Sequence, residues 1–255
     1  MRAEHPNASR IPQLRQLWQE AFGDTEAFLD SFFRVAFSPR RCLCITENDR
    51  VAAAAYWFDG EWEGKRCAYI YAVATGKAFR GRGLCRTLMG DIHRHLAELG
   101  YAGCVLVPGN EALFAMYGAM GYRKMPGIRR FRCAAGDHPA RLKPLTAEEY
   151  AQLRKKHLPA GAVVQEGENL AFLEEFYGFY QADGALLCAG KDGDALIGAE
   201  LLGTHDPGAI VAAFGCREGS FRSPGGEKVA VFHHQDLIGI VQCLIDAVQQ
   251  RQIQL

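Results

Sequence analysis

A glycine- and arginine-rich loop constrains the fold of this chain more than any other feature. The segment VATGKAFRGRGLCRTLM places Arg80-Gly81-Arg82-Gly83 between an apolar run and a segment, 84–99, with apolar residues at helical spacing. Backbone N–H groups at a helix start have no intrahelical acceptor, and the helix dipole makes that end positive. Glycines there let an anion approach the backbone. The pattern therefore predicts a strand, an anion-binding loop and a helix in succession.

Known phosphate-binding loops differ in what surrounds the glycines. A dinucleotide fingerprint needs a third glycine where this chain has Arg86, and a P-loop needs a terminal Gly-Lys-Ser/Thr, which is absent. The acetyl-CoA loop of the Gcn5-related N-acetyltransferases (GNAT) is written Arg/Gln-x-x-Gly-x-Gly/Ala. The segment from Arg80 to Cys85 resembles this loop except at Cys85, where glycine or alanine is usual. Lys77 also stands where members of this family commonly have a proline in the turn before the loop.

A second motif downstream resembles the same family. Asn110 is followed seven residues later by Tyr117 and then by Gly121-Tyr122, as in the family signature after the next strand. Its distance from the loop suits one helix and one strand. The segment LWQEAFGDTEAFLDSFF resembles the paired first helices of bacterial members. The resemblance covers about residues 2–132.

The resemblance implies both a fold and a reaction. The fold is α+β, with a mixed, splayed central β-sheet flanked by helices. The reaction is acetyl transfer from acetyl-CoA to a primary amine of a small molecule or peptide. A backbone N–H near Thr75 would polarise the thioester carbonyl, and Tyr117 would protonate the departing CoA thiolate. The residues that would bind acetyl-CoA are Val73, Ala74, Thr75, Arg80, Gly81, Arg82, Gly83, Leu84, Cys85 and Asn110.

The sequence does not identify a general base. Family members often have a carboxylate on the strand before the loop, whereas RCAYIYAVAT offers Tyr69 and Tyr71. Glu61 and Glu63 lie in the preceding turn. Water could carry the proton, the amine could arrive neutral, or another part of the chain could supply the base. The absent carboxylate also leaves a second function open, that of a non-catalytic acyl-CoA sensor or interaction protein.

Hydrophobic periodicity predicts two domains. Helices are expected over 11–22 and 25–37, three strands over 41–75, a strand over 103–108, a helix over 110–121 and a last strand over 122–133. The aperiodic segment CAAGDHPARLKP follows. We therefore expect an acetyl-CoA-binding N-acetyltransferase domain over 1–135 and a smaller α+β domain over 140–255.

The second domain partly repeats the first. AFLDSFF begins at Ala27 and AFLEEFY at Ala171, while CLC ends at Cys44 and LLC at Cys188, so both pairs are 144 residues apart. This shared offset predicts that the second domain is a degenerate GNAT half copy.

Local signals predict the remaining elements of the second domain. Thr146 and Glu149 form a capping box that starts a helix. The segment AIVAAFG is expected to be a strand, the segment 220–234 a hairpin around Ser223-Pro224-Gly225-Gly226, and the chain from about Asp236 a helix.

Composition excludes several other classes. The chain has 29 basic and 29 acidic residues, so no net charge attracts it to nucleic acid or anionic membranes. No apolar run reaches the length of a membrane span, and the first residues lack a signal-peptide core. Nine cysteines without a CxxC pair, and His93 and His95 on different helix faces, argue against metal sites and disulfides. We therefore expect a cytoplasmic protein without a metal, whose acceptor amine and oligomeric state the sequence leaves open.

Overall fold

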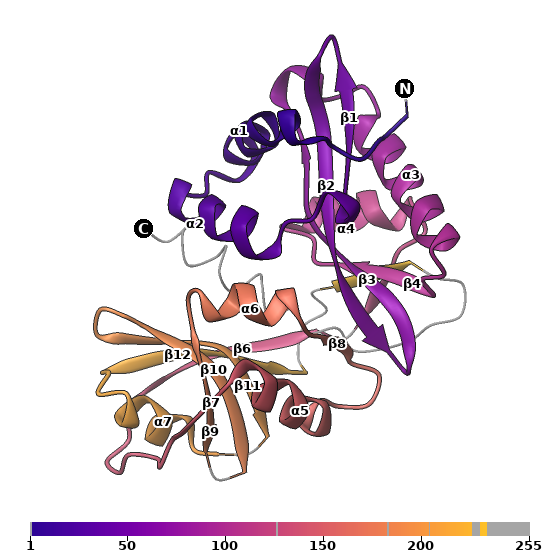
Figure 1. Ribbon diagram of the computed structural model, residues 1–255. Coiled ribbons are helices and arrows are strands. Elements are labelled where there is room, and N and C mark those ends of the chain that lie inside the picture. Colours follow the sequence, from indigo (N-terminus) through magenta and orange to yellow (C-terminus); the bar gives the residue numbers. More distant parts are fainter. Residues whose placement is uncertain (1, 126, 183, 204, 226–229, 234–255) are drawn as a thin grey trace. The chain divides into compact units, whose positions relative to one another are not determined.

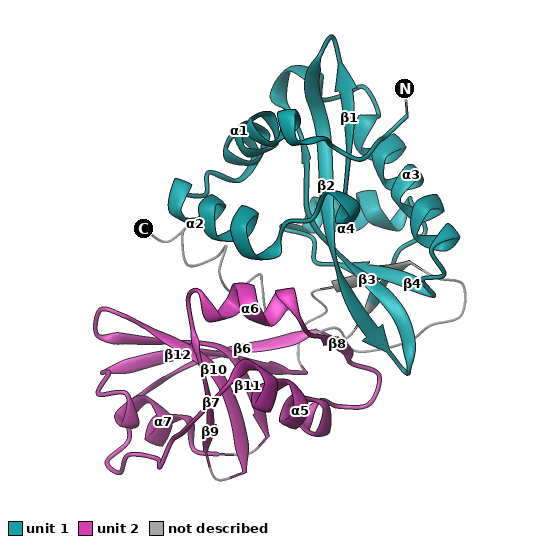
Figure 2. Cartoon of the chain, viewed as in Figure 1, with its two compact units in different colours: residues 1–124, 230–237, 249–255 teal, residues 125–229, 238–248 magenta. Residues whose placement is uncertain are grey.

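The computed structural model describes residues 2–125, 127–182, 184–203, 205–225 and 230–233. The chain forms two compact units, one of residues 1–124, 230–237 and 249–255, and one of residues 125–229 and 238–248 (Figure 2). Each unit contains its own β-sheet with helices packed on it (Figure 1).

The first unit contains the predicted strand–loop–helix succession. Its strands follow the order β1-β2-β3-β4-β13-β5, with β3 and β4 parallel and the pairs β1/β2, β2/β3 and β4/β13 antiparallel. The elements are α1 (Ile11–Phe22), α2 (Glu26–Ser31), β1 (Cys42–Glu47), β2 (Arg50–Trp62), β3 (Lys65–Thr75), α3 (Leu84–Glu98), β4 (Gly103–Leu106), α4 (Glu111–Gly118), β5 (Arg123–Met125) and β13 (Ala230–His233).

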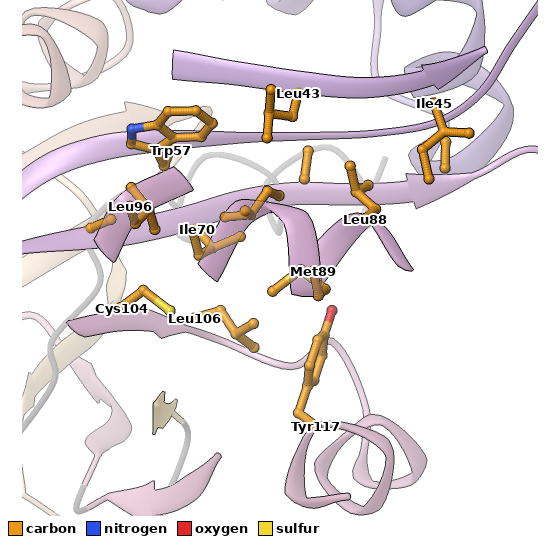
Figure 3. Close-up of a cluster of buried hydrophobic side chains, with 14 of the residues drawn as sticks. Leu43, Ile45, Trp57, Ile70, Leu88, Met89, Leu96, Cys104, Leu106 and Tyr117 are labelled. Atoms are coloured by element: carbon orange, nitrogen blue, oxygen red, sulfur yellow. The ribbon is translucent and has the colours of Figure 1, made fainter. Parts of the chain in front are cut away.

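Alternation along β2 and β3 buries both faces of the first sheet. Trp57 and Ile70 belong to a core formed with α3 and α4 (Figure 3). Their sequence neighbours Tyr56 and Tyr71 contact Trp18 of α1 instead, at ring-centroid distances of 5.1 and 5.6 Å. Because strand side chains alternate between faces, these helices cover opposite sides of the sheet.

The second unit has a sheet with the strand order β6-β12-β11-β10-β9-β7. Strands β11 and β12 are parallel, and the other neighbours are antiparallel. The elements are β6 (Ile128–Ala134), β7 (Lys143–Leu145), α5 (Ala147–His157), β8 (Val163–Gln165), α6 (Glu168–Glu174), β9 (Gly178–Ala182), β10 (Ala185–Asp192), β11 (Ala195–Gly203), α7 (Pro207–Ala213) and β12 (Glu218–Pro224).

The order of elements is similar in the two units. The series α1-α2-β1-β2-β3-α3-β4 has a counterpart in α5-α6-β9-β10-β11-α7-β12, and in both a helix joins two parallel strands. In this correspondence β10 matches β2, whereas the 144-residue offset aligned it with β1 through Cys44 and Cys188. The 144-residue offset therefore does not describe which strands of the two units correspond.

Strand pairing overturns the expected boundary between the domains. The predicted last strand of the first domain is two strands, and the longer, β6, pairs with β12 in the second sheet from Ile128↔Pro224 to Ala134↔Glu218. The structural division therefore lies near Lys124 and not between 135 and 140. The expected hairpin over 220–234 is also wrong, because β12 lies in the second sheet and β13 pairs with β4 in the first. Sequence patterns do not specify such distant partners.

The segment AIVAAFG is mostly helix α7, not a strand. Asp206 caps the helix by accepting a hydrogen bond from the Gly208 N–H, and Pro207 occupies the first turn. Buried Ile210 and Val211 explain the apolar run, because a short apolar run alone does not distinguish a helix from a buried strand. The Thr146–Glu149 capping box is confirmed. The helix predicted from about Asp236 lies outside the described residues.

Candidate functional site

The glycine loop joins β3 to α3 in the first unit. Gly83 is the N-cap residue of α3 with φ 76°, and Gly81 has φ 73°. Both values lie in the left-handed region that disfavours side chains, so the two glycines set the path of the loop. The loop and the helix start at Leu84 agree with the prediction from the sequence.

Several backbone N–H groups of this loop point to an anion site. The first N–H with an acceptor in the helix is that of Thr87, which donates to the Gly83 carbonyl at 3.1 Å. In the described part of the chain, the N–H groups of residues 83–86 have no acceptor. Free N–H groups and the positive end of the helix dipole together favour phosphate oxygens.

A cavity of about 270 Å³ lies at this loop. It brings the loop together with α4, the helix of the second sequence motif, through Met116 and the adjoining Met120. Thus two motifs that lie some 30 residues apart in the sequence form one site. The predicted site residues that line this cavity are Thr75, Arg80, Gly81, Gly83, Leu84 and Cys85.

Strands β3 and β4 separate on the way to the loop. Their pairing covers only Cys67–Tyr69 with Gly103–Val105. From Ile70 to Thr75, β3 keeps β2 as a neighbour, with a register irregularity and a positive φ of 49° at Ala72. Among the described strands none pairs with the other edge of this stretch, which contains the predicted residues Val73 and Ala74. The sheet is therefore splayed, as expected, and leaves backbone groups for an extended ligand.

The two loop arginines bond to strand ends. The Arg80 Nε donates to the Thr75 carbonyl at 3.2 Å, and the Arg82 guanidinium donates to the Glu47 carboxylate at 2.7 Å. Arg82 is absent from the cavity lining. Both arginine side chains thus have hydrogen-bond partners within the protein. They also place positive charge near the helix start. The role of Glu47 was not predicted, because its position at the end of β1 has no local signal.

Tyr117 lies on α4 and is 5% exposed. Figure 3 shows its hydroxyl directed toward α3, near Met89. Burial raises the pKa of this phenol, and the nearby Cys85 thiol raises it further. No described residue hydrogen-bonds to this hydroxyl, so its proton is available at neutral pH. Tyr117 does not itself line the cavity, but its neighbour Met116 and Cys85 do.

Cys85 and Asn110 have distinct local roles. Burial raises the pKa of the Cys85 thiol, which keeps the group neutral beside the cavity. The side chain of Asn110 caps α4 by accepting a hydrogen bond from the Leu113 N–H at 3.2 Å. One lone pair of its side-chain amide oxygen is therefore used, and its amide N–H groups remain for a ligand.

Tyr122, the last residue of the second motif, takes part in a buried polar cluster. The Tyr122 hydroxyl contacts the imidazole of His93 at 2.8 Å and the thiol of Cys104 at 3.3 Å. Its ring packs edge-on against Tyr117 at 5.5 Å. No sequence pattern connects His93 with this motif, because 29 residues separate it from Tyr122.

No carboxylate lies on β3, in agreement with the sequence. Tyr69 and Tyr71 are buried at 1% and 2% exposure, and Tyr71 contacts Trp18 on the α1 side of the sheet. Glu61 and Glu63 are exposed near the far end of β3.

In the described ranges no three His, Cys, Asp or Glu side chains could hold a metal ion. Among the described helices none is long and apolar enough to cross a membrane.

Comparisons with known proteins agree with this geometry. Residues 2–125 match the family model of the acetyltransferase (GNAT) domain. No curated protein sequence matches the chain at a significant level.

Similar solved structures extend the likeness to most of the chain. A GCN5-related N-acetyltransferase from Kribbella flavida aligns with a TM-score of 0.67 and 18% identity over 91% of this chain and 70% of its own. One from Anabaena variabilis aligns with a TM-score of 0.67 and 16% identity over 92% and 71%. Eis1 from Mycobacterium abscessus aligns with a TM-score of 0.66 and 11% identity over 92% and 74%. Such identities show the fold, a mixed α+β GNAT-like architecture.

Proposed function

We propose that the protein transfers an acetyl group from acetyl-CoA to a primary amine of a small molecule or peptide. The observation that carries the proposal is the cavity of about 270 Å³ between the glycine loop and α4. It combines free backbone N–H groups with a buried, protonated phenol nearby. The solved structures named as N-acetyltransferases share this fold, which supports the same class of reaction here.

The residues present fit acetyl-CoA in three respects. The N–H groups of residues 83–86 would hold the pyrophosphate, because they lack acceptors within the described chain. The edge of β3 between Ile70 and Thr75 would hydrogen-bond the amide groups of the pantetheine arm, because β4 has separated from it. The apolar side chains of Met116 and Met120 would line the space beside the arm. Bound acetyl-CoA would supply the acetyl group as a thioester.

Tyr117 would be the general acid. Its raised pKa keeps the phenol protonated at neutral pH, so it can deliver a proton to the departing thiolate. A backbone N–H near Thr75 would polarise the carbonyl that the amine attacks. Since β3 carries no carboxylate, the amine would arrive neutral or release its proton to water.

Calorimetry with acetyl-CoA tests the site directly. We expect wild-type protein to bind and Gly83→Asp to bind at least about tenfold more weakly, because the new carboxylate repels phosphate at the helix start. Gly23→Asp is a matched control, because Gly23 also has a positive φ, of 74°, and open space around it, at the end of α1. Equal binding by both variants, or no binding by wild type, would contradict the assignment of the loop.

The second candidate function is that of a non-catalytic acyl-CoA sensor. The observation that favours it is the absence of a carboxylate on β3, where both tyrosines are buried. Release of free CoA thiol over a panel of amines, polyamines and peptide N-termini separates the two functions. Acetyl-CoA binding without release for any acceptor would favour the sensor, whereas release with one acceptor class would establish the transferase.

A further inference from the structure

The glycine loop is connected to two different strands through its arginine side chains. Arg80 bonds to Thr75 at the end of β3, as described above, and Arg82 bonds to Glu47 at the end of β1. Glu47 and Arg82 lie 35 residues apart in the sequence. The second contact is therefore the longer-range of the two, and it joins the centre of the loop to the outer strand of the sheet.

The centre of the loop needs such connections because its two glycines contribute no side-chain contacts. Gly81 and Gly83 have no side chains, and no atom lies within 4 Å of the position that a Cβ would take at either residue. Glycine also has the largest backbone freedom in the unfolded chain and in loops. The conformation of this part of the loop must therefore be fixed by contacts at other loop residues.

Glu47 is well placed to supply one of these contacts. Its side chain is 19% exposed, whereas that of Arg82 is 47% exposed, so the carboxylate is the more fixed partner. The hydrogen bond from Arg82 lowers the pKa of Glu47, so the pair is ionised at neutral pH. The second carboxylate oxygen, Oε2, is shielded from solvent and has no hydrogen-bond partner in the described structure. Arg82 is thus the group that compensates the charge of Glu47.

We infer that Glu47 is a positioning residue that holds the glycine loop, through Arg82, in the conformation that binds the pyrophosphate. The inference rests on the proposed function, because it assigns a role at the same site. It differs from a simple electrostatic view of the loop, in which Arg82 itself contacts the phosphates. In that view Glu47 would compete with the ligand for Arg82, and its removal would strengthen binding.

The substitution Glu47→Gln separates these two roles. We expect the Kd and the KM for acetyl-CoA to rise about tenfold, because one charge-assisted hydrogen bond no longer orders the loop. The kcat at saturating acetyl-CoA should stay unchanged, because Glu47 touches no reacting atom. The melting temperature should also change little, because the Arg82 side chain is 47% exposed and water can solvate its charge when the carboxylate is removed. A matched control is Glu26→Gln, which breaks an exposed ion pair with Arg15 on α1 and should alter neither constant.

A double-mutant cycle shows whether Glu47 acts through Arg82. Arg82→Gln should weaken binding, and adding Glu47→Gln to it should have no further effect. Additive effects of the two substitutions would overturn the inference, and so would wild-type or tighter binding by Glu47→Gln alone. If wild-type protein itself fails to bind acetyl-CoA, the proposed function fails first, and the positioning role fails with it.

Discussion

A buried ion pair in the second unit permits a quantitative prediction. Arg154 of α5 and Glu200 of β11 form a two-point contact, from Nε to Oε2 at 2.8 Å and from Nη2 to Oε1 at 3.0 Å. The side chains are 1% and 0% exposed, and the buried Tyr150 hydroxyl also donates to Glu200. The perturbation is Glu200→Gln, which keeps the size of the side chain and removes its charge.

The expected cost follows from the burial of Arg154. In Glu200→Gln the guanidinium loses its counter-charge and one of its two acceptor oxygens, and among neutral acceptors it keeps the amide oxygen and a long 3.4 Å hydrogen bond to the Gln165 backbone carbonyl. Removing one member of a buried ion pair costs about 3–5 kcal/mol, because the other charge stays desolvated and uncompensated. The matched control is Glu166→Gln, whose partner Lys155 lies at 2.9 Å but whose side chain is 41% exposed. This exposed pair should contribute little.

Urea unfolding measures the difference with two probes. All three tryptophans of the chain, Trp18, Trp57 and Trp62, lie in the first unit, so their fluorescence follows that unit, while far-UV circular dichroism follows both. We expect Glu200→Gln to shift the circular dichroism transition more than the fluorescence transition. A loss of stability no larger than that of Glu166→Gln would refute the reasoning.

A triple replacement checks the physical cause. In Tyr150→Phe/Arg154→Met/Glu200→Leu, apolar side chains replace the whole buried network. Because the desolvation cost then disappears with the charges, stability should return close to that of the wild type. A triple variant as unstable as Glu200→Gln would show that specific hydrogen bonds, rather than an uncompensated charge, explain the loss.

Two further predictions concern the first unit. Tyr117→Phe should lower kcat and kcat/KM by about a hundredfold or more while leaving acetyl-CoA affinity unchanged, since it removes one proton donor and keeps the ring; steady-state kinetics with wild-type turnover would leave Tyr117 as a packing residue. Burial and the neighbouring His5, 4.8 Å away, lower the pKa of His95 from its ordinary 6.5. The folded state therefore resists protonation, so stability is full above about pH 6.5 and falls as the pH decreases below that value, where the unfolded chain binds the proton more readily. Thermal unfolding between pH 8 and 5 should show a smaller decrease for His95→Gln than for the wild type.

The site could be predicted from the sequence to the extent that its signals are local. The glycines at 81 and 83 and the helix that follows them depend on neighbours within a few residues. The likeness to a known family then indicated that the loop and α4 meet. The part played by Glu47 depends on a contact over 35 residues, for which the sequence has no pattern.

The fold, like the site, could be predicted where it depends on local sequence and could not where it depends on distant segments. The helices α1, α3 and α5 were predicted from periodicity and caps, which are properties of each segment. Membership of a sheet is not such a property, because a strand with one apolar face can pair with any compatible edge. For that reason the sequence patterns place β6 and β13 in the wrong sheets. The predicted strand at α7 is wrong for another reason, because a short apolar run fits a helix and a strand equally well.

The exchange of strands has a consequence for synthesis of the protein. Strand β4 is complete at Leu106, but the partner on its open edge, β13, begins at Ala230. A ribosome adds residues from the N-terminus at about 5–20 per second, so this edge stays unpaired for several seconds or more after its own unit has otherwise been made. An unpaired edge is a template for pairing with other chains. The nascent protein is thus most exposed to aggregation while its second unit is being translated.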